Sequence, residues 1–166
     1  MKEQTGKEGG MLESNYARAL SESFIDVMEG MAFLFAAPAS RDDVPAQAGD
    51  FLQANIDFVG QLQGRLQMAA PRSLCIELAA NMLGIEPGDA EAHRKSGDAL
   101  KEALNIVCGK FLTASFGMTL VFNLTTPVVK AISPSEAETL KNDPATACFS
   151  IDESIVYIGL KLWGAA

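Results

Sequence analysis

The stretch at positions 91–117, EAHRKSGDALKEALNIVCGKFLTASFG, organises this chain of 166 residues. On a helical wheel, at about 100° per residue, its apolar residues gather on one side. They are Leu100, Leu104, Val107 and Phe111, flanked by Ala103 and Cys108. This spacing predicts a long helix from about Glu91 to Phe116, ended by Gly117. The apolar stripe is the predicted core face, which needs a sheet or other helices to cover it.

The opposite side of this predicted helix carries Asp98, Glu102, Asn105 and Gly109. A carboxylate and a carboxamide one turn apart therefore point the same way. A glycine inside a helix costs about 1 kcal/mol relative to alanine, but it would let another backbone approach closely. From the residues alone two interpretations stay open. One is an ordinary solvated face with a tolerated glycine, which polar residues opposite a core stripe favour. The other is a functional surface.

Upstream of this helix, apolar residues recur at helical spacing from about Ser14 to Phe35. They are Leu20, Phe24, Val27, Met28, Met31 and Phe35. We interpret this face, rich in methionine and phenylalanine, as core, because such residues fill cores more often than they bind ligands. Residues 1–13 are expected to form a disordered lead-in, and 14–166 a single domain. The segment 38–49, with two prolines, is typical of a loop.

Alternating polarity predicts most of the sheet. Residues 51–69 alternate around Gly60, which predicts a hairpin with one solvated face. The other predicted elements are a short helix at 74–83, β-type residues at 118–132 interrupted by Pro127, a loop at 133–144, and strands at 146–150 and 154–162. The hairpin patterns predict an α+β fold, a mostly antiparallel sheet with about three helices, two of them long, packed on one face. No second domain and no internal repeat is evident.

Composition and charge exclude several classes of function. The formal net charge of −8 argues against nucleic-acid binding, which needs clustered Lys and Arg. The longest apolar-looking stretch, Met28–Ala37, includes Glu29 and is too short to span a membrane. The first ten residues are polar and glycine-rich, unlike the start of a secretory signal. We therefore expect a cytoplasmic protein that binds neither nucleic acid nor membrane.

The common catalytic and metal-binding residue patterns are missing from the sequence. Cys75, Cys108 and Cys148 lie far apart, which predicts reduced and mostly buried thiols. The single histidine, His93, has no nearby cysteine or second histidine, so no zinc site or histidine-based triad is expected. Neither GxxxxGK[ST] nor GxGxxG occurs, so nucleotide-binding loops are not indicated.

One family resemblance changes the interpretation of the polar helix face. Asp98-x3-Glu102-x2-Asn105, with Pro127 downstream, resembles the D/S-x3-E-x2-N…P signature of the CheX/CheC/FliY phosphatases. The order of elements is similar too: an amphipathic first helix, a hairpin, a short helix ending in NMLG, the motif helix, and TTPVV. In the first helix Glu29 is followed three residues later by alanine rather than asparagine, which resembles CheX, with one active helix, more than CheC.

The resemblance implies a phosphatase that hydrolyses the aspartyl phosphate of a CheY-like receiver domain. By the same resemblance Asn105 would orient the attacking water, and Glu102 would pair with a lysine of the receiver. Asp98 and Gly109 would be further partner contacts. The chain would need no metal or cofactor of its own, because Mg²⁺ is expected on the receiver, and it would form a homodimer.

Three alternatives remain open at this point. A non-catalytic CheX-like module could dock a receiver or another signalling protein through the same helix. A structural component related to the flagellar switch would instead assemble stably with motor proteins. A small-molecule binding domain would rest only on the Met- and Phe-rich first helix, and it ranks last.

Overall fold

The structure, a computed structural model, describes residues 5–45 and 47–165. Its helices are α1 (Thr5–Ala32), the 3-10 turn η1 (Arg41–Asp43), α2 (Arg72–Leu83), α3 (Ala90–Arg94), α4 (Ser96–Phe116) and α5 (Pro134–Asn142). Its strands are β1 (Ala36–Ala39), β2 (Phe51–Val59), β3 (Leu62–Pro71), β4 (Asn123–Leu124), β5 (Val128–Ile132), β6 (Thr146–Ile151) and β7 (Ser154–Ala165). The predicted α+β class is confirmed.

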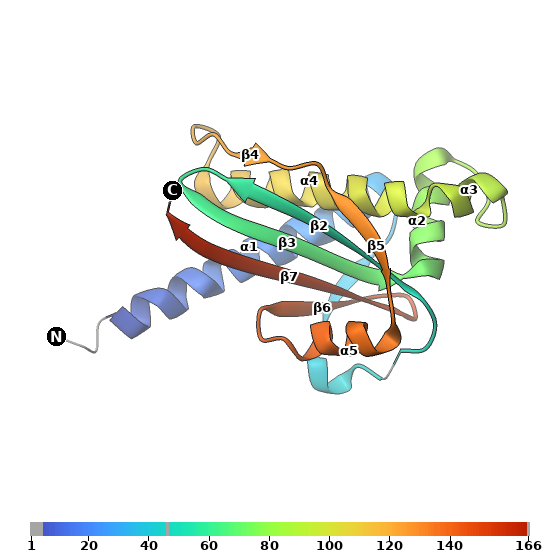
Figure 1. Cartoon of the computed structure of the whole chain (residues 1–166), viewed down its shortest axis with the longest axis horizontal. Helices are drawn as coiled ribbons and strands as arrows, with labels where there is room; N and C mark the ends of the chain where they lie inside the picture. The colour runs from blue at the N-terminus through green and yellow to red at the C-terminus, as the bar shows by residue number, and fades with distance from the viewer. Residues whose placement is uncertain (1–4, 46, 166) are drawn as a thin grey trace.

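The strands form one antiparallel sheet in the order β1-β6-β7-β3-β2, and both β4 and β5 pair with the outer edge of β2 (Figure 1). The predicted hairpin around Gly60 is β2–β3, and its register pairs Asn55 with Gln67 and Ile56 with Leu66. Successive side chains of a strand point to opposite faces, so one face of the hairpin is apolar. The predicted hairpin at the end of the chain is β6–β7, with Ile151 opposite Ser154.

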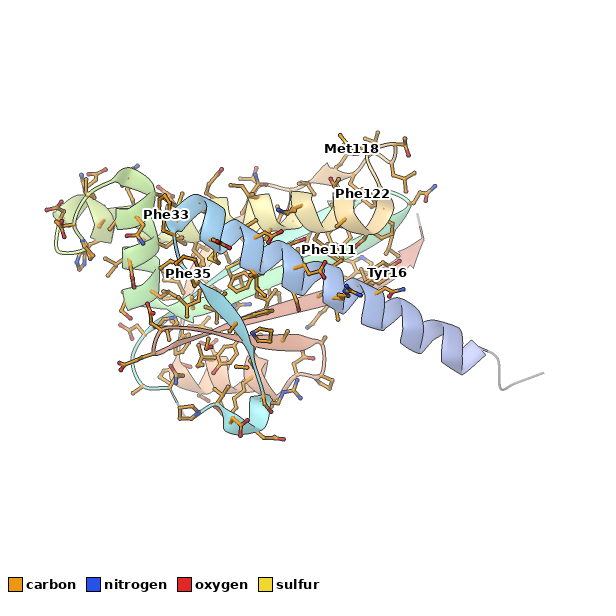
Figure 2. All side chains as sticks on the ribbon, turned by 180° about the vertical axis from the view of Figure 1, so that it is seen from behind. Tyr16, Phe33, Phe35, Phe111, Met118 and Phe122 are labelled. Atoms are coloured by element: carbon orange, nitrogen blue, oxygen red, sulfur yellow. The ribbon has the colours of Figure 1, made fainter. Side chains whose placement is uncertain are left out.

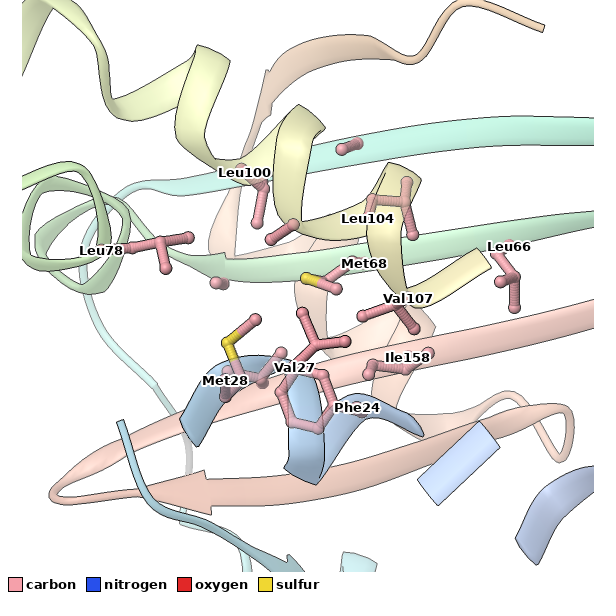
Figure 3. Close-up of a cluster of buried hydrophobic side chains, with 14 of the residues drawn as sticks. Phe24, Val27, Met28, Leu66, Met68, Leu78, Leu100, Leu104, Val107 and Ile158 are labelled. Carbon is pink, nitrogen blue, oxygen red and sulfur yellow. The ribbon is translucent and has the colours of Figure 1, made fainter. Parts of the chain in front are cut away.

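The main core lies between the sheet and the helices α1, α2 and α4. Figure 3 shows this core, where Leu100, Leu104 and Val107 of α4 meet apolar side chains of the sheet and of α1. The predicted apolar stripe of α4 is therefore confirmed as a core face. Burying each such side chain stabilises the fold by about 1.5–3 kcal/mol. An opening inside this core, lined by residues such as Phe24, Met68 and Leu100, measures about 10 Å³, room for one water at most.

The Met- and Phe-rich face of α1 belongs to this core, since Phe24, Val27 and Met28 are buried. The same helix ends earlier than predicted. Phe33 takes a left-handed backbone conformation, with φ of 55°, and its N–H donates a hydrogen bond to the carbonyl of Glu29. Phe33 and Phe35 are 75% and 70% exposed, so the prediction that Phe35 packs in the core is wrong (Figure 2).

At its other end α1 is longer than predicted. The structure describes the backbone of residues 5–13 as part of α1, where we expected a disordered lead-in. Residues 1–4 of that predicted lead-in lie outside the described residues. The long helix predicted from Glu91 is two helices, because the backbone at Lys95 leaves the helical conformation and α4 begins at Ser96. The site residues all lie within α4.

Two short elements, β1 and α5, overlap the segments 38–49 and 133–144 that were predicted as loops. β1 consists of AAPA and lacks β-branched residues, but an edge strand tolerates a proline, and β1 pairs only with β6. α5 is a helix despite its polar sequence. The Ser133 hydroxyl accepts from the N–H of Glu136, whose carboxylate accepts from the N–H of Ser133, and Pro134 occupies the first turn.

The predicted helices α1, α2 and α4 share one face of the sheet, whereas α5, which was not predicted, covers the other face. Ala137 and Leu140 of α5 contact a second apolar cluster. The buried residues of that cluster are Val44, Phe51, Ala69, Ile132, Ala137, Cys148, Ile155 and Tyr157. None of the helices in the described part of the chain combines the length and the apolarity needed to cross a lipid bilayer.

Candidate functional site

The outer face of α4 forms one wall of a surface groove of about 440 Å³. The groove is lined by Asp98, Lys101, Glu102 and Asn105 of α4 and by Leu124, Thr125, Thr126 and Pro127. The structure thus brings together Asp98, Glu102, Asn105 and Pro127, all of which the sequence singles out. Asp98 and Glu102 are exposed, whereas Asn105 is half-buried against the opposite wall.

Residues 124–127, the second wall, are attached to the sheet. The N–H of Thr125 donates to the carbonyl of Asp57 at 2.9 Å, and its Oγ1 accepts from the N–H of Asp57 at 2.9 Å. Asp57 is itself held by two hydrogen bonds from Arg65, at 2.6 and 2.9 Å. Those bonds hold the pKa of Asp57 below its ordinary value. Pro127 follows this anchor and leads into β5.

Close packing holds both ends of the segment 122–129, which contains the second wall of the groove. At one end the Phe122 ring packs against those of Phe58 and Phe116, with centroids 6.0 and 5.2 Å away. At the other end a Cβ on Gly97 would lie 3.3 Å from a methyl carbon of Val129. Glycine at 97 therefore lets the first turn of α4 approach β5.

At the groove, the negative charge of Asp98 is paired with two lysines, whereas Glu102 has no such partner within the described residues. Nζ of Lys101 lies 3.1 Å from Oδ1 of Asp98, and Nζ of Lys95 lies 3.7 Å from Oδ2. The hydrogen bond from Lys101, followed by its positive charge, holds the pKa of Asp98 below its ordinary value. Within the described residues no hydrogen bond or ion pair engages the side chains of Glu102 and Asn105. Both are free to bind a molecule in the groove.

Gly109 lies one turn beyond Asn105 on the same face. A Cβ built on Gly109 would meet no atom within 4 Å. Internal packing therefore does not require glycine here, although alanine would favour the helix by about 1 kcal/mol. The open surface at Gly109 is consistent with the close approach of another molecule.

Neither the cysteines nor the histidine contribute to the groove. Cys75, Cys108 and Cys148 are free and buried, as predicted. Burial raises the pKa of Cys75 and of Cys108 to about 12, which makes them poor nucleophiles. His93 is exposed in α3. Among the residues that the structure describes, no three His, Cys, Asp or Glu side chains gather to hold a metal ion.

Sequence reasoning missed four residues of the groove, which are Lys101, Leu124, Thr125 and Thr126. Lys101 follows Asp98 by three positions, a spacing at which helix side chains meet, and this signal was available. Thr125 and Thr126 immediately precede Pro127, but the position of this segment depends on the contact of Thr125 with Asp57, 68 residues away in the chain. No local pattern announces such a contact.

Comparison with known proteins shows that the groove lies in a region shared with a known protein family. Residues 52–150 match the family described as "Chemotaxis phosphatase CheX", and the whole groove lies inside the matched region. This chain belongs to the CheX family. No curated protein sequence matches it significantly.

Solved structures of CheX and CheC-like proteins share its fold. A CheX from Desulfovibrio desulfuricans matches 89% of this chain and 99% of its own, with 17% identity and a TM-score of 0.66. A CheC-like superfamily protein from a Shewanella species matches 90% and 98%, with 22% identity and a TM-score of 0.65. The CheX–CheY–BeF₃–Mg²⁺ complex from Borrelia burgdorferi matches 90% and 98%, with 18% identity and a TM-score of 0.64.

Proposed function

We propose that this CheX-family protein hydrolyses the aspartyl phosphate of a CheY-like receiver domain. The observation that carries the proposal is the groove in which Glu102 and Asn105, one turn apart, have no partner within the described chain. Membership of a family described as chemotaxis phosphatases supports it, as does the relative crystallised with CheY.

Asn105 would orient the attacking water. Its carboxamide oxygen can accept a hydrogen bond from the water and its NH₂ group can donate one to a phosphoryl oxygen, without adding negative charge beside the phosphoryl group. The water oxygen attacks phosphorus while the bond from phosphorus to the aspartyl oxygen breaks. The products are inorganic phosphate and the free carboxylate of the receiver. Catalysis of this kind depends mainly on in-line geometry and charge stabilisation, which a positioned amide can provide.

Glu102 would fix the docking geometry by pairing with a lysine of the receiver. Its exposed carboxylate has no cation of its own within the described residues, so it can form this ion pair without breaking another. The pair gains strength as docking excludes water from the groove. The phosphorylated aspartate and the Mg²⁺ would both come with the receiver, and this chain would supply no cofactor. Gly109, one turn beyond Asn105 on the same face of α4, extends the proposed contact surface, and Asp98 lies one turn before Glu102 at the other end of this face.

The decisive experiment measures phosphate release from a phosphorylated CheY-like receiver. We expect the native protein to accelerate release and Asn105→Ala to lose at least about a hundredfold in rate, the scale that a misplaced reacting group costs. Asn142→Ala, an exposed asparagine on α5, is the matched control and should behave as the native protein does. Circular dichroism should show the same fold for both variants. Normal activity of Asn105→Ala would refute the proposal.

Glu102→Ala separates binding from chemistry. We expect the KM for the phosphorylated receiver to rise about tenfold, because the variant loses one ion pair of the interface. Glu29→Ala, an exposed glutamate on α1, is its control. If the native protein binds the receiver without accelerating phosphate release, the chain is a docking module instead.

Two further expectations accompany this proposal. The protein would act in the cytoplasm, where its receiver is phosphorylated, and it would be a homodimer, as the family resemblance implies. Light scattering of the full chain, with and without receiver, would measure the stoichiometry.

A further inference from the structure

Lys101 is a charged residue of the groove to which the proposed mechanism gives no role. It stands on α4 one turn before Asn105, and its side chain is 33% exposed. Its ammonium lies 3.1 Å from Asp98, which also faces Lys95 at 3.7 Å. The carboxylate of Asp98 therefore faces Lys101 of its own helix and Lys95, which immediately precedes that helix, and both reduce the negative charge it offers to a partner.

The ion pair between Asp98 and Lys101 contributes little to the stability of the fold. Asp98 is exposed, and exposed pairs at this spacing add little to stability. The pair does restrict where a long, flexible lysine side chain points, and Lys101 lines the groove. The groove consequently offers two unlike charges to a partner: the carboxylate of Glu102 and the ammonium of Lys101.

We propose that Lys101 binds an anionic oxygen of the docked receiver, and that Asp98 positions Lys101 rather than touching the receiver itself. The inference rests on the proposed function and refines the contact expected of Asp98. The anionic oxygen belongs either to the phosphoryl group or to a carboxylate at the rim of the receiver's pocket. An ammonium is suited to both, because it is a point charge with three donors.

The test is a double-mutant cycle on phosphatase activity, with Lys101→Gln, Asp98→Asn and the double variant. We expect Lys101→Gln to lower kcat/KM about tenfold, the value of one charge-assisted hydrogen bond at its low end. Lys101→Arg should recover most of the activity. Asp98→Asn should cost about threefold alone and nothing in the Lys101→Gln background, because it acts through Lys101.

The kinetic constants distinguish the two sources of the oxygen. A fall in kcat assigns the contact to the phosphoryl group, whose charge is reorganised in the transition state. A rise in KM with unchanged kcat, together with a weaker salt dependence of binding, assigns it to a receiver carboxylate. Lys110→Gln is the control, since Lys110 lies on the same helix but pairs with Asp26 of α1 at 3.1 Å.

Several outcomes would overturn the inference while leaving the proposed function intact. If Asn105→Ala is inactive but Lys101→Gln keeps both constants, Lys101 has no contact with the receiver. If Asp98→Asn costs as much in the Lys101→Gln background as alone, Asp98 touches the receiver directly. Binding to the receiver in Mg²⁺ and beryllofluoride is measured in parallel. A native protein without turnover would refute the proposed function, and Lys101 would then be judged on Kd alone.

Discussion

The two long helices, α1 and α4, lie side by side on the same face of the sheet, yet only α4 carries the candidate site (Figures 1 and 2). The strand order explains why they can be compared. With β5 taken as the edge strand, the sheet has the order β1-β6-β7-β3-β2-β5. This order is symmetric about its centre, because β1, β2 and β3 in one half occupy the positions that β5, β6 and β7 occupy in the other half. Each long helix therefore precedes one edge strand of the sheet in the chain: α1 precedes β1, and α4 precedes β5. This two-fold relation exists in the topology, although no internal repeat is evident in the sequence.

The outer faces of the two helices differ in chemistry. On α1 the exposed glutamates Glu22 and Glu29 are followed three residues later by Ile25 and Ala32, so neither has an amide one turn away. Glu22 is already paired with Arg18 at 3.0 Å. A shared scaffold therefore does not by itself produce a site, which also needs the right side chains without internal partners.

The grooves beside the two helices differ as well. The groove beside α4 is lined largely by polar residues, including Thr125 and Thr126. The groove beside α1 measures about 670 Å³ and is lined largely by apolar residues, including Leu20, Leu160 and Leu162. In the second half of the chain the longer connection after α4 supplies a hydrogen-bonded wall. The candidate site thus lies in only one half of a scaffold that both halves of the chain build.

The largest expected effect tests whether both helices are equally needed as scaffold. Phe24 of α1 and Phe111 of α4 are both fully buried. Phe24→Ala and Phe111→Ala should each lower the free energy of unfolding by about 3–5 kcal/mol, because each leaves a cavity in a close-packed core. Urea denaturation measures this. A cost below about 1 kcal/mol for Phe24→Ala would show that α1 is not part of the scaffold in solution.

The next effect tests the hydrogen-bonded wall at residues 124–127, which lies opposite α4. Thr125→Val keeps the shape of the side chain but removes the hydroxyl that accepts from the N–H of Asp57. We expect a loss of about 1 kcal/mol of unfolding free energy. Phosphate release should fall about threefold to tenfold, because the wall opposite Asn105 becomes less fixed. Thr139→Val, on the exposed surface of α5, is the control. Unchanged turnover would mean that the outer face of α4 supports hydrolysis without a fixed wall at residues 124–127.

These differences also explain what sequence reasoning could and could not predict. The core stripe of α4, the two hairpins and the Glu102–Asn105 pair depend on local periodicity, and the structure places them as predicted. The helix α5 has a local signal too, Ser133 followed three residues later by Glu136, which the flanking prolines outweighed. Here the capping chemistry was a better guide than overall polarity.

Other features depend on contacts between distant parts of the chain. β1 has weak strand propensity and forms because β6 offers it a partner, with Ala36 opposite Ile151. The wall at Thr125 requires Asp57, and the direction of Lys101 matters only once a groove exists beside it. The part of the candidate site on the helix was therefore predictable, whereas on the wall only Pro127 was singled out from the sequence.

The smallest expected effect separates scaffold from surface most sharply. Gly30 of α1 and Gly109 of α4 are both helical, and a Cβ on either would meet no atom within 4 Å. Gly30→Ala and Gly109→Ala should each raise the free energy of unfolding by up to about 1 kcal/mol, since alanine favours the helix.

Only Gly109→Ala should weaken receiver binding, by about fivefold or more, because the new methyl group would occupy space that the docked receiver needs. Titration calorimetry with the receiver in Mg²⁺ and beryllofluoride compares the two variants directly. If both are stabilised and bind alike, the receiver does not approach α4 at this turn, and the contact surface ends at Asn105. If Gly109→Ala alone loses affinity, glycine at 109 is retained at the expense of helix stability for the sake of the partner.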